Sequence, residues 1–87
     1  MRFLTHRVFE RQSKKLSHTL RDKMWERIAV LSVEEFNPLL NNHKLGHPYQ
    51  EYRSINITGD YRLVYRRIDA STLYLRAVGT HHQLYGS

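Results

Sequence analysis

Two histidines and a tyrosine stand close together at the end of the chain, in the segment Gly79–Ser87 that follows a strand-like run. The histidines are His81 and His82, and the tyrosine is Tyr85. Histidine is the side chain whose ordinary pKa lies nearest neutrality, so an imidazole at the end of a strand can carry protons in phosphodiester chemistry. The alternative is a solvated tail with no chemical role, and the tail taken alone does not decide between the two.

Cleavage of RNA without a metal needs groups of three kinds. One removes the proton of the ribose 2′-hydroxyl, another donates a proton to the leaving 5′-oxygen, and a cation stabilises the charge that develops on the phosphorane. His43 and His81 could transfer the protons, and Arg62 could supply the cation. Asp60 could orient a neighbour or act on a proton itself, and Tyr61 or Tyr85 could stack on an unpaired base.

Other catalytic chemistries have less support in the sequence. His43 and His47 are four residues apart, but no helix is expected around them and no acidic residue completes a ligand set, so we expect no metal site. The chain has no nucleophile elbow around a serine and no glycine-rich phosphate loop. These patterns leave acid–base chemistry without a metal or cofactor, or plain binding.

The charge balance predicts a polyanionic partner. Lysine and arginine number 14 against 8 acidic residues, which gives a net charge of +6. Nucleic acid, an acidic protein and an anionic membrane all fit such a charge. A membrane is the least supported, because the chain has no run of about 18 apolar residues and its first residues lack the apolar core of a signal peptide. The absence of cysteine fits a cytoplasmic protein.

Length and periodicity predict the elements that must position these groups. With 87 residues the chain forms one domain, 1–87, large enough for one sheet covered by helices on one side. Apolar residues at spacings of three and four predict a helical hairpin, and alternating residues predict strands. The expected order is a strand at 2–6, helices at 8–16 and 18–31, a loop at 41–48, and strands at 52–57, 61–68 and 72–78. This βααβββ order predicts a small α+β domain with an antiparallel sheet and the helical hairpin packed on one face.

Alternation divides the residues of the second predicted β-hairpin strand between the two faces of the sheet. Arg62, Val64 and Arg66 share one face, and Leu63 and Tyr65 share the other. The sequence does not decide which face meets the helices. Arg62 and Arg66 could equally be surface residues that protect the sheet from aggregation.

Three segments, together with the order of elements, resemble the RelE/ParE toxin superfamily and most closely its YafQ-like branch. They are the loop 42–45, the hairpin 52–65 and the ending 79–86, which reads G-T-H-x-x-L-Y-G. The resemblance covers essentially the whole chain and implies a RelE-like fold, also described as microbial RNase-like. It further implies a type II toxin that cleaves mRNA in the ribosomal A site, next to 16S rRNA, and that is silenced by an antitoxin with an acidic segment.

The resemblance also implies roles for individual residues. His43 and His81 match two histidines used for acid–base work, Asp60 matches a turn aspartate, and Tyr85 stands where the family has an aromatic residue. Arg62 matches an arginine of RelE-type toxins. The RNA is expected to contact Lys44, Arg53, Tyr61, Arg66 and Arg76.

The chain departs from the YafQ-like pattern at positions that bear on the chemistry. Ser54 and Asn56 stand where YafQ has an aspartate and a histidine, and Ala77 stands where it has an arginine. Two other functions on the same scaffold therefore stay open, a ParE-like inhibitor of DNA gyrase and a basic nucleic-acid-binding domain. His43, Asp60 and His81 together favour the nuclease, because a binder has no need of proton carriers at those positions.

Overall fold

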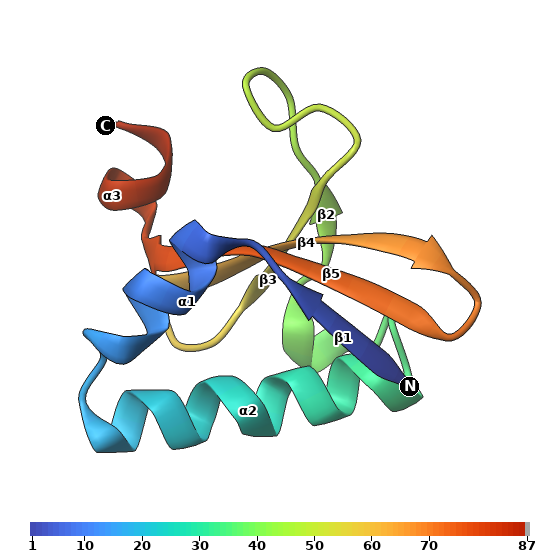
Figure 1. Cartoon of the computed structure of the whole chain (residues 1–87), viewed down its shortest axis with the longest axis horizontal. Helices are drawn as coiled ribbons and strands as arrows, with labels where there is room; N and C mark the ends of the chain where they lie inside the picture. The colour runs from blue at the N-terminus through green and yellow to red at the C-terminus, as the bar shows by residue number, and fades with distance from the viewer. Residues whose placement is uncertain (87) are drawn as a thin grey trace.

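A five-stranded mixed sheet with the two long helices on one face forms the centre of the protein (Figure 1). The computed structural model describes residues 1–86. Its elements are β1 (Arg2–Thr5), α1 (Arg7–Lys14), α2 (His18–Val33), the 3₁₀ turn η1 (Pro38–Leu40), β2 (His43–Lys44), β3 (Arg53–Asn56), β4 (Tyr61–Asp69), β5 (Thr72–Thr80) and α3 (His81–Tyr85). The strand order is β1-β5-β4-β3-β2, so the two longest strands lie in the middle.

The α+β class, the helical hairpin and the three-stranded meander are confirmed, and three details of the prediction were wrong. The sheet is mixed, because β1 pairs with β5 in parallel, with Arg2 opposite Thr72 and Thr5 opposite Leu75. The predicted loop at 41–48 contains the short strand β2, which pairs antiparallel with β3. The end of the chain forms a helix, α3, where no regular structure was expected.

Side chains and backbone groups explain where the two long helices begin. The Nδ1 atom of His6 accepts a hydrogen bond from the backbone N–H of Val8 at 3.0 Å and so caps α1. Ser17 caps α2 by accepting from the N–H of Leu20 at 3.2 Å, which confirms the predicted start of the second helix at residue 18. Across the corner, the Arg21 guanidinium donates to the carbonyl oxygens of Ser13, Lys14 and Leu16. The angle between the helices is therefore held by polar contacts.

The main core lies between the helices and one face of the sheet. Phe9, Met24, Ile28 and Leu31 of the helices pack on Ile57, which follows β3, and on the buried side chains of the strands, which are Ile55, Leu63, Tyr65, Leu73, Leu75 and Val78. Leu63 and Tyr65 thus point toward the helices, and Val64 points away, as alternation predicts. The structure decides what the sequence left open: the face of Arg62 and Arg66 is the one without the two long helices.

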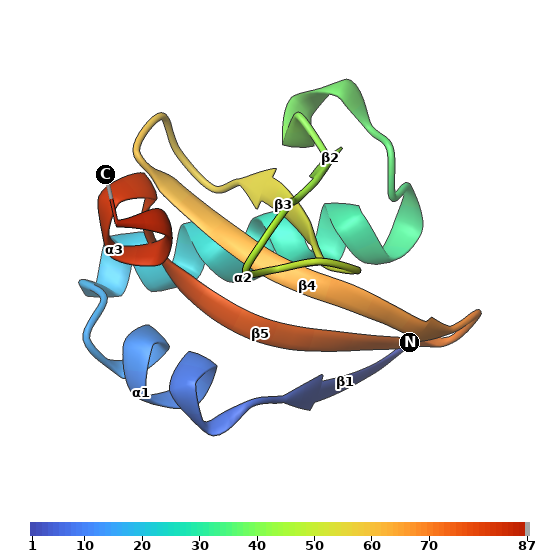
Figure 2. The same cartoon turned by 90° about the horizontal axis from the view of Figure 1, so that it is seen from above.

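The opposite face of the sheet is partly covered by the β2–β3 loop and by α3 (Figures 1 and 2). Its small apolar cluster consists of Val64, Ala77 and Leu84 with Leu45, Tyr49, Tyr52 and Tyr85 packed against them. The pairing of β4 with β5 shifts by one residue, because Val64 pairs with Ala77 whereas Tyr65 pairs with Leu75. The shift places Leu75 in the main core and Ala77 in the small cluster on the opposite face. Arg76 is the extra residue of this bulge, and its side chain is re-aimed over the ring of Tyr49.

Candidate functional site

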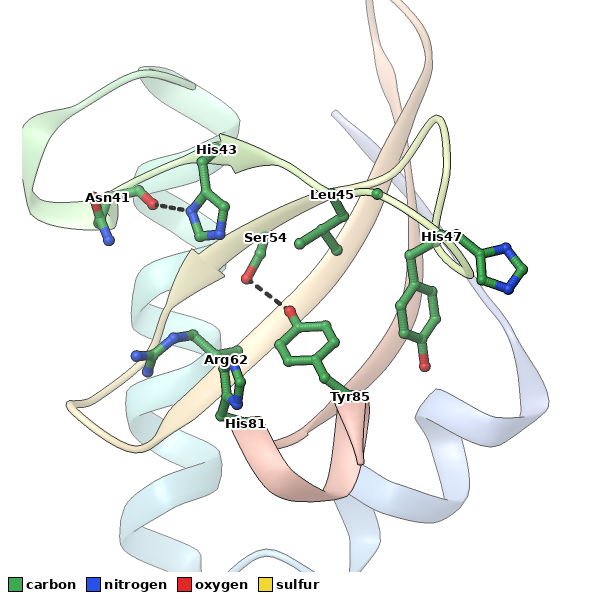
Figure 3. A pocket seen from close by; sticks show the side chains of 10 residues that line it. Asn41, His43, Leu45, His47, Ser54, Arg62, His81 and Tyr85 are labelled. Carbon is green, nitrogen blue, oxygen red and sulfur yellow. Dashed lines mark hydrogen bonds between the residues drawn. The ribbon is translucent and has the colours of Figure 1, made fainter. Parts of the chain in front are cut away.

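A pocket with a volume of about 340 Å³ opens on the face of the sheet opposite the long helices (Figure 3). Its walls come from β2 and the loop after it, from β3 and β4, and from α3. The lining residues are Asn41, His43, Leu45, Gly46, His47, Tyr49, Ser54, Arg62, His81 and Tyr85. Four of the five predicted catalytic residues, His43, Arg62, His81 and Tyr85, therefore meet in one place, although His43, Arg62 and the segment 81–85 lie far apart in the chain.

His43 enters the pocket from the edge strand β2, opposite Ser54 of β3. Its Nδ1 atom lies 3.0 Å from the carbonyl oxygen of Asn41. A carbonyl oxygen can only accept, so the neutral imidazole that makes this bond carries its proton on Nδ1 and leaves Nε2 as an acceptor. In Figure 3 the His43 ring points across the opening toward Arg62 and His81.

A hydrogen-bond network on the other side of the sheet holds the segment before His43. The buried Tyr65 hydroxyl donates to Glu35 Oε2 at 2.6 Å and accepts from Asn42 Nδ2 at 2.7 Å. Asn42 Oδ1 in turn accepts from Arg53 Nε at 2.7 Å, and Glu35 Oε1 accepts from Arg67 Nε at 3.0 Å. Burial, with the Glu35 carboxylate beside the phenol, raises the pKa of Tyr65, so this hydroxyl stays a donor.

The helix α3 presents His81 and Tyr85 on the same side, because residues four apart in a helix are neighbours. It begins with a capping box: Thr80 Oγ1 accepts from the N–H of Gln83, and Gln83 Oε1 accepts from the N–H of Thr80. The rings of His81 and Tyr85 meet edge to face with centroids 4.7 Å apart. The Tyr85 hydroxyl donates to the buried Ser54 Oγ at 3.3 Å, which joins α3 to β3.

Arg62 is held in the pocket wall by the turn between β3 and β4. Its Nη1 atom donates to the carbonyl oxygens of Gly59, Thr58 and Tyr61 at 2.8, 3.1 and 3.3 Å. All three bonds use one nitrogen, so the turn does not engage Nε or Nη2. The side chain is thus pre-positioned, and a guanidinium is suited to bind phosphate oxygens.

The structure does not bring Asp60 or Tyr61 to the pocket wall. Asp60 is exposed in the β3–β4 turn, where its N–H donates to Thr58 Oγ1 at 3.3 Å. Tyr61 points to the helix side of the sheet, packs against the main core and lines a separate hollow with Gln12 and Gly79. A tyrosine there cannot stack on a base that occupies the pocket.

The predicted RNA-contacting cations lie beside the pocket. Lys44, Arg53 and Arg66 line a second hollow at the start of β3, and the Arg76 guanidinium carbon lies 6.0 Å from the centroid of the Tyr49 ring. Among residues 1–86, no helix is long and apolar enough to cross a membrane, and no three metal-ligating side chains gather.

Some lining residues were not predicted from the sequence as catalytic or RNA-binding residues; among them, Ser54 was noted only as a departure from the YafQ-like pattern. Alternation already places Ser54 on the face opposite Ile55, which is the face of Arg62, so its position was available as a signal. Tyr49 lies in a loop without periodicity, so no local pattern predicts that it lines the pocket. The T-x-x-Q sequence from Thr80 to Gln83 is a capping-box pattern that could have predicted α3.

Comparison with known proteins relates the chain to bacterial toxins. A family model described as "Bacterial toxin of type II toxin-antitoxin system, YafQ" matches residues 1–86. The crystal structure of YafQ from E. coli strain BL21(DE3) has a TM-score of 0.83 at 20% identity, covering 99% of this chain and 100% of that one. The E. coli DinJ-YafQ toxin-antitoxin complex gives 0.79 at 19% identity, with 97% and 96% covered. No curated protein sequence matches.

A toxin described as YoeB/ParE shares the fold as well. The YoeB/ParE toxin from Agrobacterium tumefaciens has a TM-score of 0.79 at 19% identity, and the match covers 93% of this chain and 99% of that one. Identities at this level establish the fold, and the family match establishes the membership.

Proposed function

Because the chain belongs to the YafQ family of bacterial type II toxins, we propose that it is a ribosome-dependent mRNA endoribonuclease that cleaves by acid–base chemistry without a metal. The observation that supports this most is the meeting of His43, Arg62, His81 and Tyr85 around one open pocket. Two proton carriers and a cation that line one pocket match the groups that metal-free RNA cleavage requires.

His43 is the base in this mechanism. Its Nδ1–H bond to Asn41 leaves Nε2 of the neutral ring ready to take the proton of the ribose 2′-hydroxyl. The 2′-oxygen then attacks the adjacent phosphorus. The network from Glu35 through Tyr65 to Asn42 supports the residue before His43, so it positions the base without touching the substrate.

His81 is the acid and Arg62 is the stabilising cation. As the bond from phosphorus to the 5′-oxygen breaks, protonated His81 donates to that oxygen, which leaves a 5′-hydroxyl and a 2′,3′-cyclic phosphate that can open to a 3′-phosphate. Arg62, fixed by the turn carbonyls, neutralises the charge on the phosphorane oxygens. Tyr85 packs edge to face on His81 and thereby fixes the imidazole, and its ring offers a surface for a base.

The partners follow from the same proposal. The chain binds mRNA in the ribosomal A site, beside 16S rRNA in the cytoplasm, and its charge of +6 favours this polyanionic surface. A cognate antitoxin neutralises it, as the DinJ-YafQ complex of E. coli illustrates for a structurally similar toxin. We expect the antitoxin to use an acidic segment against the basic face.

Primer extension on mRNA from cells that express the chain without an antitoxin tests the proposal. We expect discrete cuts within codons and arrest of translation. His81→Gln should lower the cleavage rate about 10²- to 10⁴-fold, the usual contribution of a proton-transfer residue. His82→Gln is the matched control, because His82 lies on the same helix but does not line the pocket.

Two outcomes would overturn the proposal. Intact mRNA accompanied by chromosome damage would identify a gyrase inhibitor in place of a nuclease. Equal loss of cleavage in the His81 and His82 variants would show that the helix matters only as a scaffold.

A further inference from the structure

A cationic notch lies next to the pocket at the start of β3. Its volume is about 340 Å³, and it is lined by Lys44, Leu45, Glu51, Tyr52, Arg53, Arg66 and Arg67. Leu45, in the loop after β2, lines both hollows, so they adjoin at this residue. The notch exists because β4 is longer than β3. The pairing of these strands stops at Arg53 and Tyr65, and the next two residues of β4, Arg66 and Arg67, extend beyond this pair.

The charges of the notch are only partly compensated. Arg67 is paired with Glu35 at 3.0 Å and also donates to the carbonyl oxygens of Asp69 and Ala70. Glu51 is the one acidic residue in the lining. Four cations against the carboxylates of Glu35 and Glu51 leave an excess of two positive charges, which a bound anion would balance.

Among the cations that line the notch, Arg66 is the one that has a buried nitrogen without a hydrogen-bond partner in the described part of the chain. Its guanidinium carbon lies 5.5 Å from the ring centroid of Tyr52 and 6.0 Å from that of Tyr74, so two aromatic rings fix its orientation. Its Nε atom is buried and has no hydrogen-bond partner among the described residues. An unsatisfied buried donor is costly, and an anion bound in the notch beside it is one way to compensate it.

Aromatic rings connect the notch to the pocket. The ring of Tyr85 meets that of Tyr49 with centroids 6.0 Å apart, and Tyr49 meets Tyr52 at 6.3 Å. Rings between two positively charged hollows match the alternation of bases and phosphates in a single strand of nucleic acid. An acidic peptide would use the charges but has no need of the rings.

We propose that the notch is a second phosphate subsite, which holds a phosphate of the RNA strand next to the one cleaved in the pocket. This rests on the proposed function, since it assumes that RNA occupies the pocket. Arg66 and Lys44 bind the phosphate, Arg53 adds its charge, and the tyrosines carry the intervening base.

The salt dependence of RNA affinity tests the subsite separately from cleavage. The probe is a fluorescent oligoadenylate with 2′-O-methyl riboses, which cannot be cleaved by 2′-hydroxyl attack. We expect Arg66→Gln to weaken binding at least about tenfold, the equivalent of one charged hydrogen bond, and to reduce the slope of log affinity against log salt by about 0.7, the value for one phosphate contact in a single strand. Lys44→Gln changes an exposed side chain of the same notch and should reduce the slope similarly.

Arg27→Gln is the matched control, because Arg27 also has buried guanidinium nitrogens without a partner but does not line the notch. It removes the same charge and should lower affinity less than Arg66→Gln does. Unchanged slopes in both the Arg66 and the Lys44 variants would overturn the subsite.

Two further results separate its failure from other failures. If the chain cleaves no mRNA but both notch variants still lose one phosphate contact, the proposed function fails and the anion site stands. If polyglutamate binding falls in the notch variants while RNA binding does not, the notch serves an acidic protein segment, and the RNA subsite is refuted.

Discussion

Removal of one buried hydroxyl should measure how much the network beneath His43 contributes to the fold. Tyr65→Phe keeps a ring in a position that is 0% exposed, so the core stays filled. It removes the bond to Glu35 Oε2 and the bond from Asn42 Nδ2. A hydrogen bond to a charged group contributes about 1.5–3 kcal/mol. Glu35 keeps Arg67 and Asn42 keeps the Glu35 carbonyl, so we expect a loss of about 2 kcal/mol, in the lower part of that range.

Urea denaturation followed by circular dichroism gives the free energy of unfolding for this variant. Tyr61→Phe is the control, because within residues 1–86 the hydroxyl of this partly buried tyrosine makes no hydrogen bond while its ring also packs on the main core. We expect the control to stay within about 0.5 kcal/mol of the parent, with unchanged denaturant slopes in both variants. Equal stability of the two variants would refute the idea that the network holds β2.

The pH dependence supplies a second test of the same hydroxyl. Burial raises the pKa of Tyr65 above its ordinary value of 10.0. Above about pH 10 the unfolded chain therefore releases this proton while the folded chain retains it, so the stability contributed by Tyr65 is present below pH 10 and declines as the pH rises. The parent should lose stability above pH 10 more steeply than Tyr65→Phe. Parallel curves would contradict the raised pKa.

Three further predictions concern the ends of helices and the pocket wall. In Gly79→Ala the new Cβ would lie 2.8 Å from Gln83 Oε1, so the capping box of α3 should weaken by about 1 kcal/mol in thermal unfolding, with a lower cleavage rate through His81. Partial burial and the nearby Arg76 lower the pKa of His6, the cap of α1. As the pH falls below about 6.5, the unfolded chain therefore takes up a proton before the folded chain does, and the free energy of unfolding should fall. His6→Asn should show a smaller fall over the same pH range. Ser54→Ala removes the acceptor of the Tyr85 hydroxyl at a cost of about 1 kcal/mol and should slow single-turnover cleavage while RNA affinity stays unchanged; an unaffected rate would mean that this bond does not orient His81.

Much of the fold was readable because its signals are local. The apolar spacing along α1 and α2, the Ser17 cap and the alternation in β3, β4 and β5 all act over a few neighbouring residues. The same holds for the ending of the chain, where the residues that carry the family resemblance also form the capping box and the edge-to-face pair of His81 and Tyr85.

The pocket could be predicted only in part, because its wall is made by contacts between distant positions. Sequence reasoning found His43, Arg62, His81 and Tyr85, but it also chose Asp60 and Tyr61, which the turn and the pleat of β4 direct elsewhere. A shift of one residue along a strand moves a side chain to the other face. Tyr61 and Arg62 therefore point to opposite faces of the sheet although they are neighbours in sequence.

The amino-acid sequence by itself determined the elements, the basic charge and the residue types that can move protons. Periodicity and capping depend on neighbouring residues, and composition and net charge are sums over the residues of the chain. Only the tertiary structure decided which face of the sheet carries the arginines, that β1 runs parallel to β5, and that β4 extends past β3 to form the notch. Those choices depend on burial and pairing between segments far apart in the chain, such as Glu35 with Tyr65 and Ser54 with Tyr85. No local pattern contains that information.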